Sequence, residues 1–155
     1  MAKKLRWGLL STAKINRALI TPIKESERSE LVAVSSRSAE KAEAYARDQS
    51  IPQAFGSYEA MLASPEIDAV YIPLPNDMHH PWTIKALSTG KHVLCEKPLA
   101  CNADQAREMA LLAEKTGCLL MEAFMYRCHP QTAKLVELIR DGAIGEVRLI
   151  QAAFS

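Results

Sequence analysis

The 155-residue sequence lacks a long apolar run, an excess of charge of either sign, and paired cysteines. No stretch of about 18 apolar residues is present, which excludes a membrane-spanning helix. The amino terminus, MAKKLRWGLLS, has only the short apolar stretch Trp7–Leu10, too short for a secretory signal peptide. With 19 Lys and Arg residues against 18 Asp and Glu residues, the net charge is +1. This balance argues against a protein that binds nucleic acid without regard to sequence.

The four cysteines form no C-x-x-C pair. Without a secretory signal, we expect reduced thiols in a cytoplasmic protein rather than a disulfide framework. Cys95 and Cys118 fall in or before predicted strands, where a buried and unreactive thiol is typical, and Cys101 and Cys128 fall in predicted loops. Cys128 is followed by His129, but no second pair at ligand spacing exists, so the sequence predicts no metal site.

Short apolar runs alternate with segments of helical periodicity as far as residue 123. Six runs are typical of strands: Leu5–Leu10, Leu31–Ser35, Gln53–Phe55, Ala69–Ile72, His92–Cys95 and Leu119–Ala123. Helices are predicted over Thr12–Ile23, Ala39–Gln49 and Ser57–Leu62, from His80 or Pro81 to Ser88, and from the cap Asn102 to Lys115. This alternation predicts a doubly wound α/β fold, a parallel sheet with right-handed crossovers and helices on both faces.

The alternation of strand-like and helical segments ends after His129. Gln131–Arg140 is amphipathic, Gly142 and Gly145 indicate a turn, and Val147–Phe154 reads as the beginning of another strand. No internal repeat, low-complexity tract or flexible linker is present.

The turn after the first predicted strand has a reduced form of a phosphate-binding pattern. Ser11-Thr12-Ala13 stands where a dinucleotide-binding turn has G-x-G, and Asn16 takes the third glycine position. Ser11 and Ala13 are still small, and a hydroxyl can donate to a phosphate. Taken alone, the segment is a weak signal for a pyrophosphate-binding turn, and an ordinary capped helix start is the alternative.

The end of the second predicted strand carries hydroxyls and cations. An NAD site usually has Asp or Glu here to hold the ribose 2′-hydroxyl, and that carboxylate would repel a 2′-phosphate. This chain has Ser35-Ser36-Arg37-Ser38, with Lys41 one turn further on. These groups suit a phosphate monoester and favour NADP over NAD, although a capped helix with a solvated arginine is the alternative.

The fourth predicted strand is followed by Pro73-Leu74-Pro75, which stiffens the backbone as it leaves the sheet. Asn76 can bond an amide or a ribose hydroxyl, and His79 can do the same or transfer a proton. A helix-start loop with surface histidines is the alternative, and His80 is assigned a structural role.

The fifth predicted strand runs into Glu96-Lys97-Pro98. An acid and a lysine at the end of a buried strand are costly to desolvate unless they have a partner or a task. A lysine here can hydrogen-bond a substrate oxygen and donate a proton. Pro98 restricts the backbone of Lys97, and the bond between them is a candidate for the cis form. A surface ion pair before a loop is the alternative.

Taken together, WGLLSTAKI, SSRS, YIPLPNDMHH, HVLCEKP and EAFMYRCHP resemble the Gfo/Idh/MocA oxidoreductases, the family of glucose-fructose oxidoreductase and inositol dehydrogenase. The resemblance is strongest to the branch of dimeric dihydrodiol dehydrogenases and sugar dehydrogenases, and it runs in order over nearly all of the chain. E-K-P is its most specific mark, and M-Y-R-x-H-P supports it. It implies NADP, or NAD, bound over the sheet, and hydride transfer between the nicotinamide C4 and a sugar, polyol or diol carbon.

The resemblance also implies roles for individual residues. The cofactor-binding positions are Ser11, Thr12, Ala13, Lys14 and Ile15 at the pyrophosphate, Ser36, Arg37 and Lys41 at the adenosine phosphate, and Leu74, Asn76 and His79 at the nicotinamide ribose. Glu96 and Lys97 are implied to lie beside the nicotinamide, with Lys97 polarising the reacting oxygen, and Arg127 to reach the cofactor or the substrate. Lys97, Glu96 and His79 are the candidate catalytic residues. Ser11 departs from the usual glycine, which leaves the closeness of the pyrophosphate open.

The resemblance assigns residues 1–125 to a cofactor-binding Rossmann domain and residues 126–155 to a connecting helix and the first strand of a second α/β domain. That second domain would form the substrate wall and the contact between subunits of a homo-oligomer. We therefore expect this chain to bind the cofactor and to turn over a small-molecule substrate poorly by itself. A non-catalytic NADP-binding or interaction module is the alternative, and a domain for another nucleotide is a third reading. The intact Glu96-Lys97-Pro98 favours the oxidoreductase.

Overall fold

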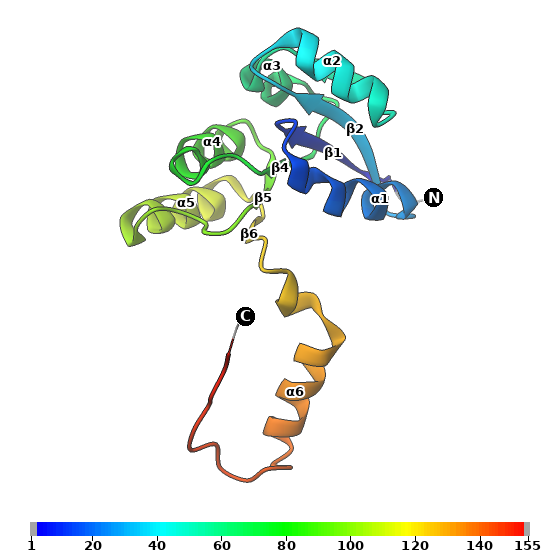
Figure 1. Cartoon of the computed structure of the whole chain (residues 1–155). Coiled ribbons are helices and arrows are strands. Elements are labelled where there is room, and N and C mark those ends of the chain that lie inside the picture. Colours follow the sequence, from blue (N-terminus) through cyan, green and yellow to red (C-terminus); the bar gives the residue numbers. More distant parts are fainter. Residues whose placement is uncertain (1–2, 154–155) are drawn as a thin grey trace. The chain divides into compact units, whose positions relative to one another are not determined.

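A six-stranded, all-parallel sheet organises the first part of the chain in the computed structural model, which describes residues 3–153 (Figure 1). The strands are β1 (Leu5–Leu10), β2 (Ser29–Ser35), β3 (Gln53–Phe55), β4 (Ala69–Ile72), β5 (His92–Cys95) and β6 (Leu120–Glu122). Their order is β3-β2-β1-β4-β5-β6. The order reverses between β1 and β4, which makes the carboxyl ends of these two strands the point where a doubly wound sheet binds its ligand.

Helices connect the strands and cover both faces of the sheet. They are the 3₁₀ turn η1 (Lys14–Asn16), α1 (Arg17–Glu25), α2 (Ala39–Asp48), α3 (Tyr58–Ala63), α4 (Asn76–Ser88) and α5 (Ala103–Thr116). Residues of α1 and α2 pack with Leu9, Val34 and Tyr71 on one face. Residues of α3, α4 and α5 pack with Val70 and Ile72 on the other. The predicted doubly wound α/β class is therefore confirmed.

Close packing of α3 on the sheet explains the glycine in β1. A Cβ atom added to Gly8 would lie 3.1 Å from Sδ of Met61, a fully buried side chain of α3. The register of β1 with β2 also shifts between Trp7 and Gly8. A side chain at position 8 would therefore require the end of the Met61 side chain to shift by a few tenths of an ångström.

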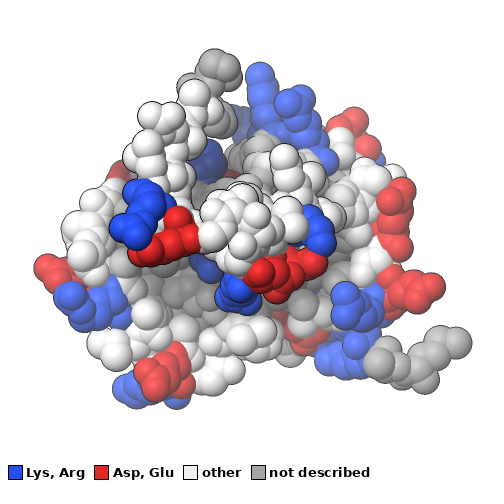
Figure 2. Space-filling model, turned by 90° about the horizontal axis from the view of Figure 1, so that it is seen from below, with Lys and Arg blue, Asp and Glu red and all other residues white. Residues whose placement is uncertain are grey.

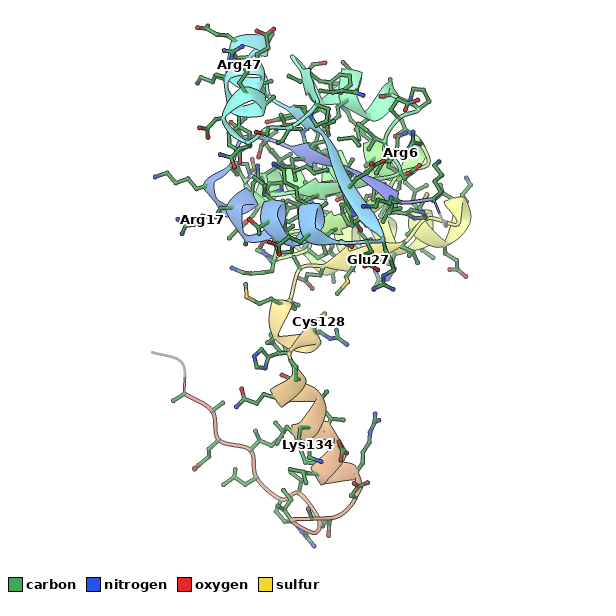
Figure 3. All side chains as sticks on the ribbon, turned by 90° about the vertical axis from the view of Figure 1, so that its right-hand side faces the viewer. Arg6, Arg17, Glu27, Arg47, Cys128 and Lys134 are labelled. Atoms are coloured by element: carbon green, nitrogen blue, oxygen red, sulfur yellow. The ribbon has the colours of Figure 1, made fainter. Side chains whose placement is uncertain are left out.

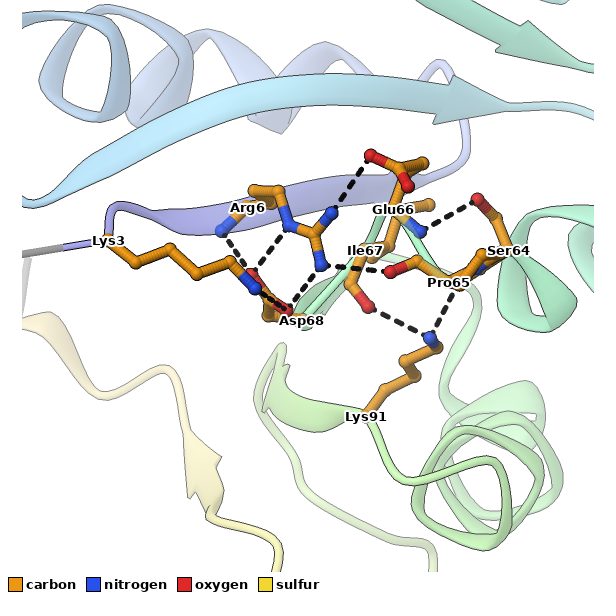
Figure 4. Close-up of polar contacts among 8 residues, drawn as sticks. All are labelled: Lys3, Arg6, Ser64, Pro65, Glu66, Ile67, Asp68 and Lys91. Atoms are coloured by element: carbon orange, nitrogen blue, oxygen red, sulfur yellow. Dashed lines mark hydrogen bonds and ion pairs between the residues drawn. The ribbon is translucent and has the colours of Figure 1, made fainter.

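A polar network holds the amino ends of the strands (Figure 4). Arg6 in β1 donates from Nε and Nη2 to the two carboxylate oxygens of Asp68, which directly precedes β4, at 2.9 and 2.8 Å. Arg6 also binds Glu66 at 2.9 Å and the carbonyl of Pro65 at 2.8 Å. Lys91, directly before β5, is buried and donates to the carbonyls of Ser64 and Ile67. The network thus ties together the segments that enter β1, β4 and β5.

The remaining residues form a second compact unit, Phe124–Ser155, distinct from Met1–Ala123. It contains the 3₁₀ turn η2 (Met125–Cys128) and α6 (Pro130–Arg140). His129 caps α6, because its Nδ1 accepts a hydrogen bond from the amide of Gln131. Residues 147–153 are irregular, because no described strand pairs with them. The strand expected over Val147–Phe154 is therefore not formed in its described part, and Phe154 lies outside the described residues.

Two predicted helix boundaries need correction. The first helix begins later than Thr12, because Thr12 and Ala13 stay non-helical and the 3₁₀ turn η1 precedes α1. The fourth helix begins earlier than His80, at Asn76, so that Pro81 lies inside it. Pro81 and Asp77, whose carbonyl Pro81 cannot bind, both lie exposed, and water can hydrate that carbonyl.

Charges of both signs are mixed on the surface. On the face drawn in Figure 2, basic and acidic side chains often lie next to one another rather than in one field of a single sign. In the part of the chain that the structure describes, no helix has the length and apolar character needed to span a bilayer.

Candidate cofactor site

A cavity of about 580 Å³ lies at the carboxyl ends of β1, β2 and β4. It is formed by the segments that follow these strands together with α2 and the start of α3. The lining residues are Ser11, Thr12, Ala13, Ser36, Arg37, Ser38, Lys41, Tyr58, Pro73, Leu74 and Pro75. The cavity therefore occupies the point of strand-order reversal, where the fold is expected to bind its ligand.

The turn after β1 is held in an uncommon backbone conformation. Ser11 has φ = 142°, a region that favours glycine. Its hydroxyl accepts a hydrogen bond from the amide of Ala13, and its carbonyl accepts one from the side-chain amide of Asn16 at 2.8 Å. Asn16 is fully buried, with Oδ1 unpaired within the described residues. Asn16 thus fixes a serine in the conformation that a glycine would adopt without strain.

The segment after β2 presents the cations. The buried Ser35 donates to the carbonyl of Leu9, which ties the ends of β1 and β2 together. Ser38 caps α2, because its hydroxyl accepts from the amide of Lys41. Arg37 and Lys41 line the cavity and remain exposed. Arg17, by contrast, projects outward at the start of α1 (Figure 3) and does not line the cavity.

Tyr58 is a cavity residue that sequence reasoning missed. It begins α3 and is buried, and its ring meets that of Trp82 edge to face at 4.8 Å. Burial raises the pKa of the Tyr58 hydroxyl, and the neighbouring Arg37 guanidinium opposes that shift. The tyrosine therefore adds a protonated donor beside Arg37. The sequence gives no sign of this, because Tyr58 reaches the cavity only through the position of α3, which begins after the cap Ser57.

His79 is buried rather than exposed to the cavity. Its ring nitrogens lie 2.7 Å from two carbonyl oxygens, Nδ1 from that of Pro98 and Nε2 from that of Leu74. It thereby connects the segment after β4 to the segment after β5. Both ring nitrogens thus face backbone carbonyls, which favours a positioning role.

Glu96 and Lys97 extend β5 at the same edge of the sheet as the cavity. The amide of Glu96 donates to the carbonyl of Ile72, the last residue of β4, at 3.1 Å. Glu96 is half-buried, whereas Lys97 is exposed, and the Lys97–Pro98 bond is cis. The side chain of Glu122, at the end of β6, accepts from the amide of Leu99 at 2.7 Å. Glu122 is a second residue that sequence reasoning missed, because its partner is 23 residues away.

The structure thus brings together part of the predicted set. Ser11, Thr12, Ala13, Ser36, Arg37, Lys41 and Leu74 line one cavity. The other predicted positions do not line it: Lys14, Ile15, Asn76, His79, Glu96, Lys97 and Arg127. Arg127 lies in η2, in the second unit.

Three of the four cysteines follow the expected pattern of burial, whereas Cys118, expected to be buried, is only half-buried. Cys95 is fully buried in β5, and burial raises the pKa of its thiol to about 12, so it stays protonated. Cys101 and Cys128 are exposed; Cys128 is labelled in Figure 3.

Comparison with known proteins identifies the class. A sequence model described as "Oxidoreductase family, NAD-binding Rossmann fold" matches residues 5–124. The chain belongs to this family, Gfo/Idh/MocA, and its first unit is the family's NAD(P)-binding Rossmann domain. The predicted resemblance is confirmed.

Particular relatives lie within the same family. The chain is 43% identical over 151 residues to a D-xylose 1-dehydrogenase (NADP(+)) of Haloferax volcanii, covering 97% of this chain and 46% of that protein. It is 38% identical to trans-1,2-dihydrobenzene-1,2-diol dehydrogenase of Xenopus laevis, covering 96% and 46%. Among solved structures, the KijD10 3-ketoreductase of Actinomadura kijaniata in complex with NADP matches with a TM-score of 0.85 and 35% identity, covering 94% and 47%. The chain therefore spans about half the length of these relatives.

Proposed function

We propose that the chain binds NADP(H) in the cavity at the carboxyl ends of β1, β2 and β4, and that the protein transfers a hydride between this cofactor and a carbon of a sugar, polyol or diol. The observation that carries the proposal is the composition of the cavity wall. Among the described residues, the wall contains Arg37 and Lys41 but no Asp or Glu.

The residues present fit a dinucleotide with a 2′-phosphate. The guanidinium of Arg37 can bind two phosphate oxygens, and the ammonium of Lys41 adds a second positive charge. Ser36 supplies a hydroxyl at the end of β2, where an NAD site would carry a carboxylate. The turn Ser11–Ala13 gives small side chains and backbone amides for the pyrophosphate, with Lys14 and Ile15 at the helix start behind it. The volume of about 580 Å³ is within the usual range of ligand sites.

The nicotinamide end of the site is assigned to the segments after β4 and β5. When bound, the cofactor supplies or accepts the hydride. Lys97 is exposed there, and its ammonium can donate a hydrogen bond to the reacting oxygen and then transfer a proton to it. Asn76 and Leu74 border the ribose, and His79 holds the two segments together. The role of Arg127 at the cofactor or substrate remains part of this proposal.

The named relatives support the substrate class. Their names specify a xylose dehydrogenase that uses NADP, a dihydrodiol dehydrogenase and a 3-ketoreductase. We further propose that residues 126–155 begin a second domain, that the full-length protein is a homo-oligomer, and that it works in the cytoplasm. Free thiols at all four cysteines suit that reducing compartment.

Titration of the chain with NADPH and with NADH, followed by nicotinamide fluorescence, tests the proposal. We expect tighter binding of NADPH and a loss of about tenfold to a hundredfold in its affinity on Arg37→Ala, because one charge-assisted phosphate contact is removed. Arg47→Ala is the matched control, since Arg47 lies on the same helix, α2, but outside the cavity. Equal affinity for the two cofactors, or equal effects of the two variants, would contradict a 2′-phosphate site at Arg37.

A further inference from the structure

Tyr71 makes a polar contact from inside the core that the proposed function does not use. It is the third residue of β4 and is 1% exposed. Its ring packs with Leu9 and Ile20 in the core beneath α1 and α2. A buried hydroxyl is costly unless it is hydrogen-bonded, and this one donates to Oε1 of Glu96 at 2.5 Å.

The geometry of the sheet brings this pair together. Tyr71 pairs with Leu94 across the ladder between β4 and β5. Glu96 follows Leu94 by two residues, so both side chains leave β5 on the face that carries Tyr71. The phenol therefore reaches along that face from the core to a carboxylate at the carboxyl edge of the sheet.

The Glu96 carboxylate in turn meets the backbone of the next residue. Within residues 3–153 it accepts two hydrogen bonds, one on each oxygen. Oε1 accepts from Tyr71, and Oε2 accepts from the amide of Lys97 at 3.3 Å. The ring of Tyr71 is fixed by core packing and has only two side-chain torsions, so it fixes the carboxylate more firmly than a surface donor would.

The tyrosine is a permanent donor in this pair. Burial, together with the Glu96 carboxylate, raises the pKa of Tyr71 far above its ordinary value. Its hydroxyl therefore keeps its proton at neutral pH and donates to the Glu96 carboxylate.

We propose that Tyr71 is a positioning residue of the nicotinamide end of the site: its hydroxyl fixes the Glu96 carboxylate and, through it, the backbone amide of Lys97, before the cofactor binds. This inference rests on the proposed function, because it assigns the Glu96–Lys97 segment to the nicotinamide. It predicts that loss of the Tyr71 hydroxyl weakens binding at the nicotinamide end of the site. Binding at the adenosine 2′-phosphate end, at Arg37 and Lys41, should be unchanged.

The variant Tyr71→Phe removes the hydroxyl and keeps the ring. The first measurement is hydrogen exchange of the Lys97 amide in the cofactor-free chain, followed by NMR. We expect exchange to accelerate about threefold to tenfold, as loss of about one hydrogen bond implies. The second measurement compares affinities for NADPH and for adenosine 2′,5′-bisphosphate, which lacks the nicotinamide half. We expect NADPH to bind about threefold to tenfold more weakly and the bisphosphate to bind as in the wild type.

Tyr45→Phe is the matched control. Tyr45, on α2, packs against the same core as Tyr71, but its hydroxyl forms no hydrogen bond with another described residue. It is expected to change neither measurement. If Tyr71→Phe fails to fold, Glu96→Gln is the second variant. In Glu96 the two donors bind different oxygens, Tyr71 at Oε1 and the Lys97 amide at Oε2. Glutamine replaces one of these oxygens by an NH2 group, which cannot accept a hydrogen bond, so when Tyr71 keeps the remaining oxygen the Lys97 amide should again exchange faster.

The outcomes separate this inference from the proposed function. An unchanged Lys97 amide in Tyr71→Phe overturns the positioning role. Equal weakening of NADPH and of the bisphosphate also overturns it, because that result indicates general loosening of the fold. If the wild type binds neither ligand, the proposed function fails, and the amide exchange of the cofactor-free chain still decides whether Tyr71 fixes Glu96 and Lys97.

Discussion

Lys91 provides a quantitative test of how the amino edge of the sheet is held. Its ammonium is buried and donates to the carbonyls of Ser64 at 2.7 Å and Ile67 at 2.8 Å, in the turn between α3 and β4. Burial lowers the pKa of Lys91, but these two contacts compensate much of the cost of desolvating the charge. The perturbation we consider is Lys91→Met, which keeps the length and the apolar stem of the side chain.

The expected loss follows from the two carbonyls. A buried acceptor without a partner costs about 1–3 kcal/mol, a cost that applies in full to the Ile67 carbonyl and in part to the less buried Ser64 carbonyl. Removal of a desolvated charge and burial of the methionine offset part of this. We expect the free energy of unfolding to fall by about 2–3 kcal/mol and the melting temperature to fall by about 5–10 °C.

Urea unfolding followed by circular dichroism measures this loss, and NADPH titration of the folded variant supplies a second readout. Lys91 precedes β5 and lies at the amino ends of the strands, whereas the cavity lies at the carboxyl ends. NADPH affinity should therefore stay within about twofold of the wild type, a change well under 1 kcal/mol. Lys85→Met is the control: Lys85 is half-exposed, with Glu59 at 2.9 Å and the Trp82 ring at 4.1 Å, and its loss should cost less than about 1 kcal/mol. A loss in Lys91→Met no larger than in Lys85→Met would refute this reasoning.

Two further predictions concern the cavity and the acid stability of the fold. Tyr58→Phe removes a donor beside Arg37 but keeps the ring packed on Trp82, so NADPH affinity should fall by about threefold to tenfold while the melting temperature changes little. Calorimetric titration of both forms checks this, and unchanged NADPH affinity would exclude Tyr58 from the phosphate contact. The Arg6 guanidinium holds the pKa of Asp68 well below its usual range, so folding is stabilised above the unfolded pKa of about 4 and this stabilisation is lost as the pH falls further. Urea unfolding at pH 7 and pH 3 should show a smaller acid loss in Asp68→Asn than in the wild type, and equal losses would contradict the assignment.

Sequence periodicity predicted the sheet well because its central strands are buried on both faces. Three strands, at Leu5–Leu10, Ala69–Ile72 and His92–Cys95, have the bounds that the apolar runs predicted. The edge strand Gln53–Phe55 also has its predicted bounds, although it is not buried on both faces. Such runs stand out from the Ala-, Glu- and Lys-rich helices between them. The start of α4 was predicted too late because a proline usually marks a helix boundary. Here Pro81 lies inside the helix, on an exposed turn where water can hydrate the carbonyl that Pro81 leaves unbonded.

The candidate site was predictable only where its chemistry is local. The proposed 2′-phosphate site could be predicted because, in one short segment around Arg37, hydroxyl and basic residues stand where an NAD site usually has an acid. Tyr58, Tyr71 and Glu122 were not predictable, because each gains its polar partner from a different part of the chain. In the sequence Tyr71 is one apolar member of the strand AVYI, and only the register of β4 with β5 reveals its partner.

The two edges of the sheet differ in how completely their polar groups are satisfied. At the amino edge, Arg6, Asp68 and Lys91 lie in a network of short contacts. At the carboxyl edge, Ser11 adopts a conformation that favours glycine, and the buried Oδ1 of Asn16 has no partner among the described residues. Strained and unsatisfied groups persist where the surrounding structure imposes them, and they concentrate at functional sites. Here the strain falls on the turn proposed for the pyrophosphate, in the wall of the cavity that also contains Arg37 and Lys41, and it therefore supports a ligand site at the carboxyl edge.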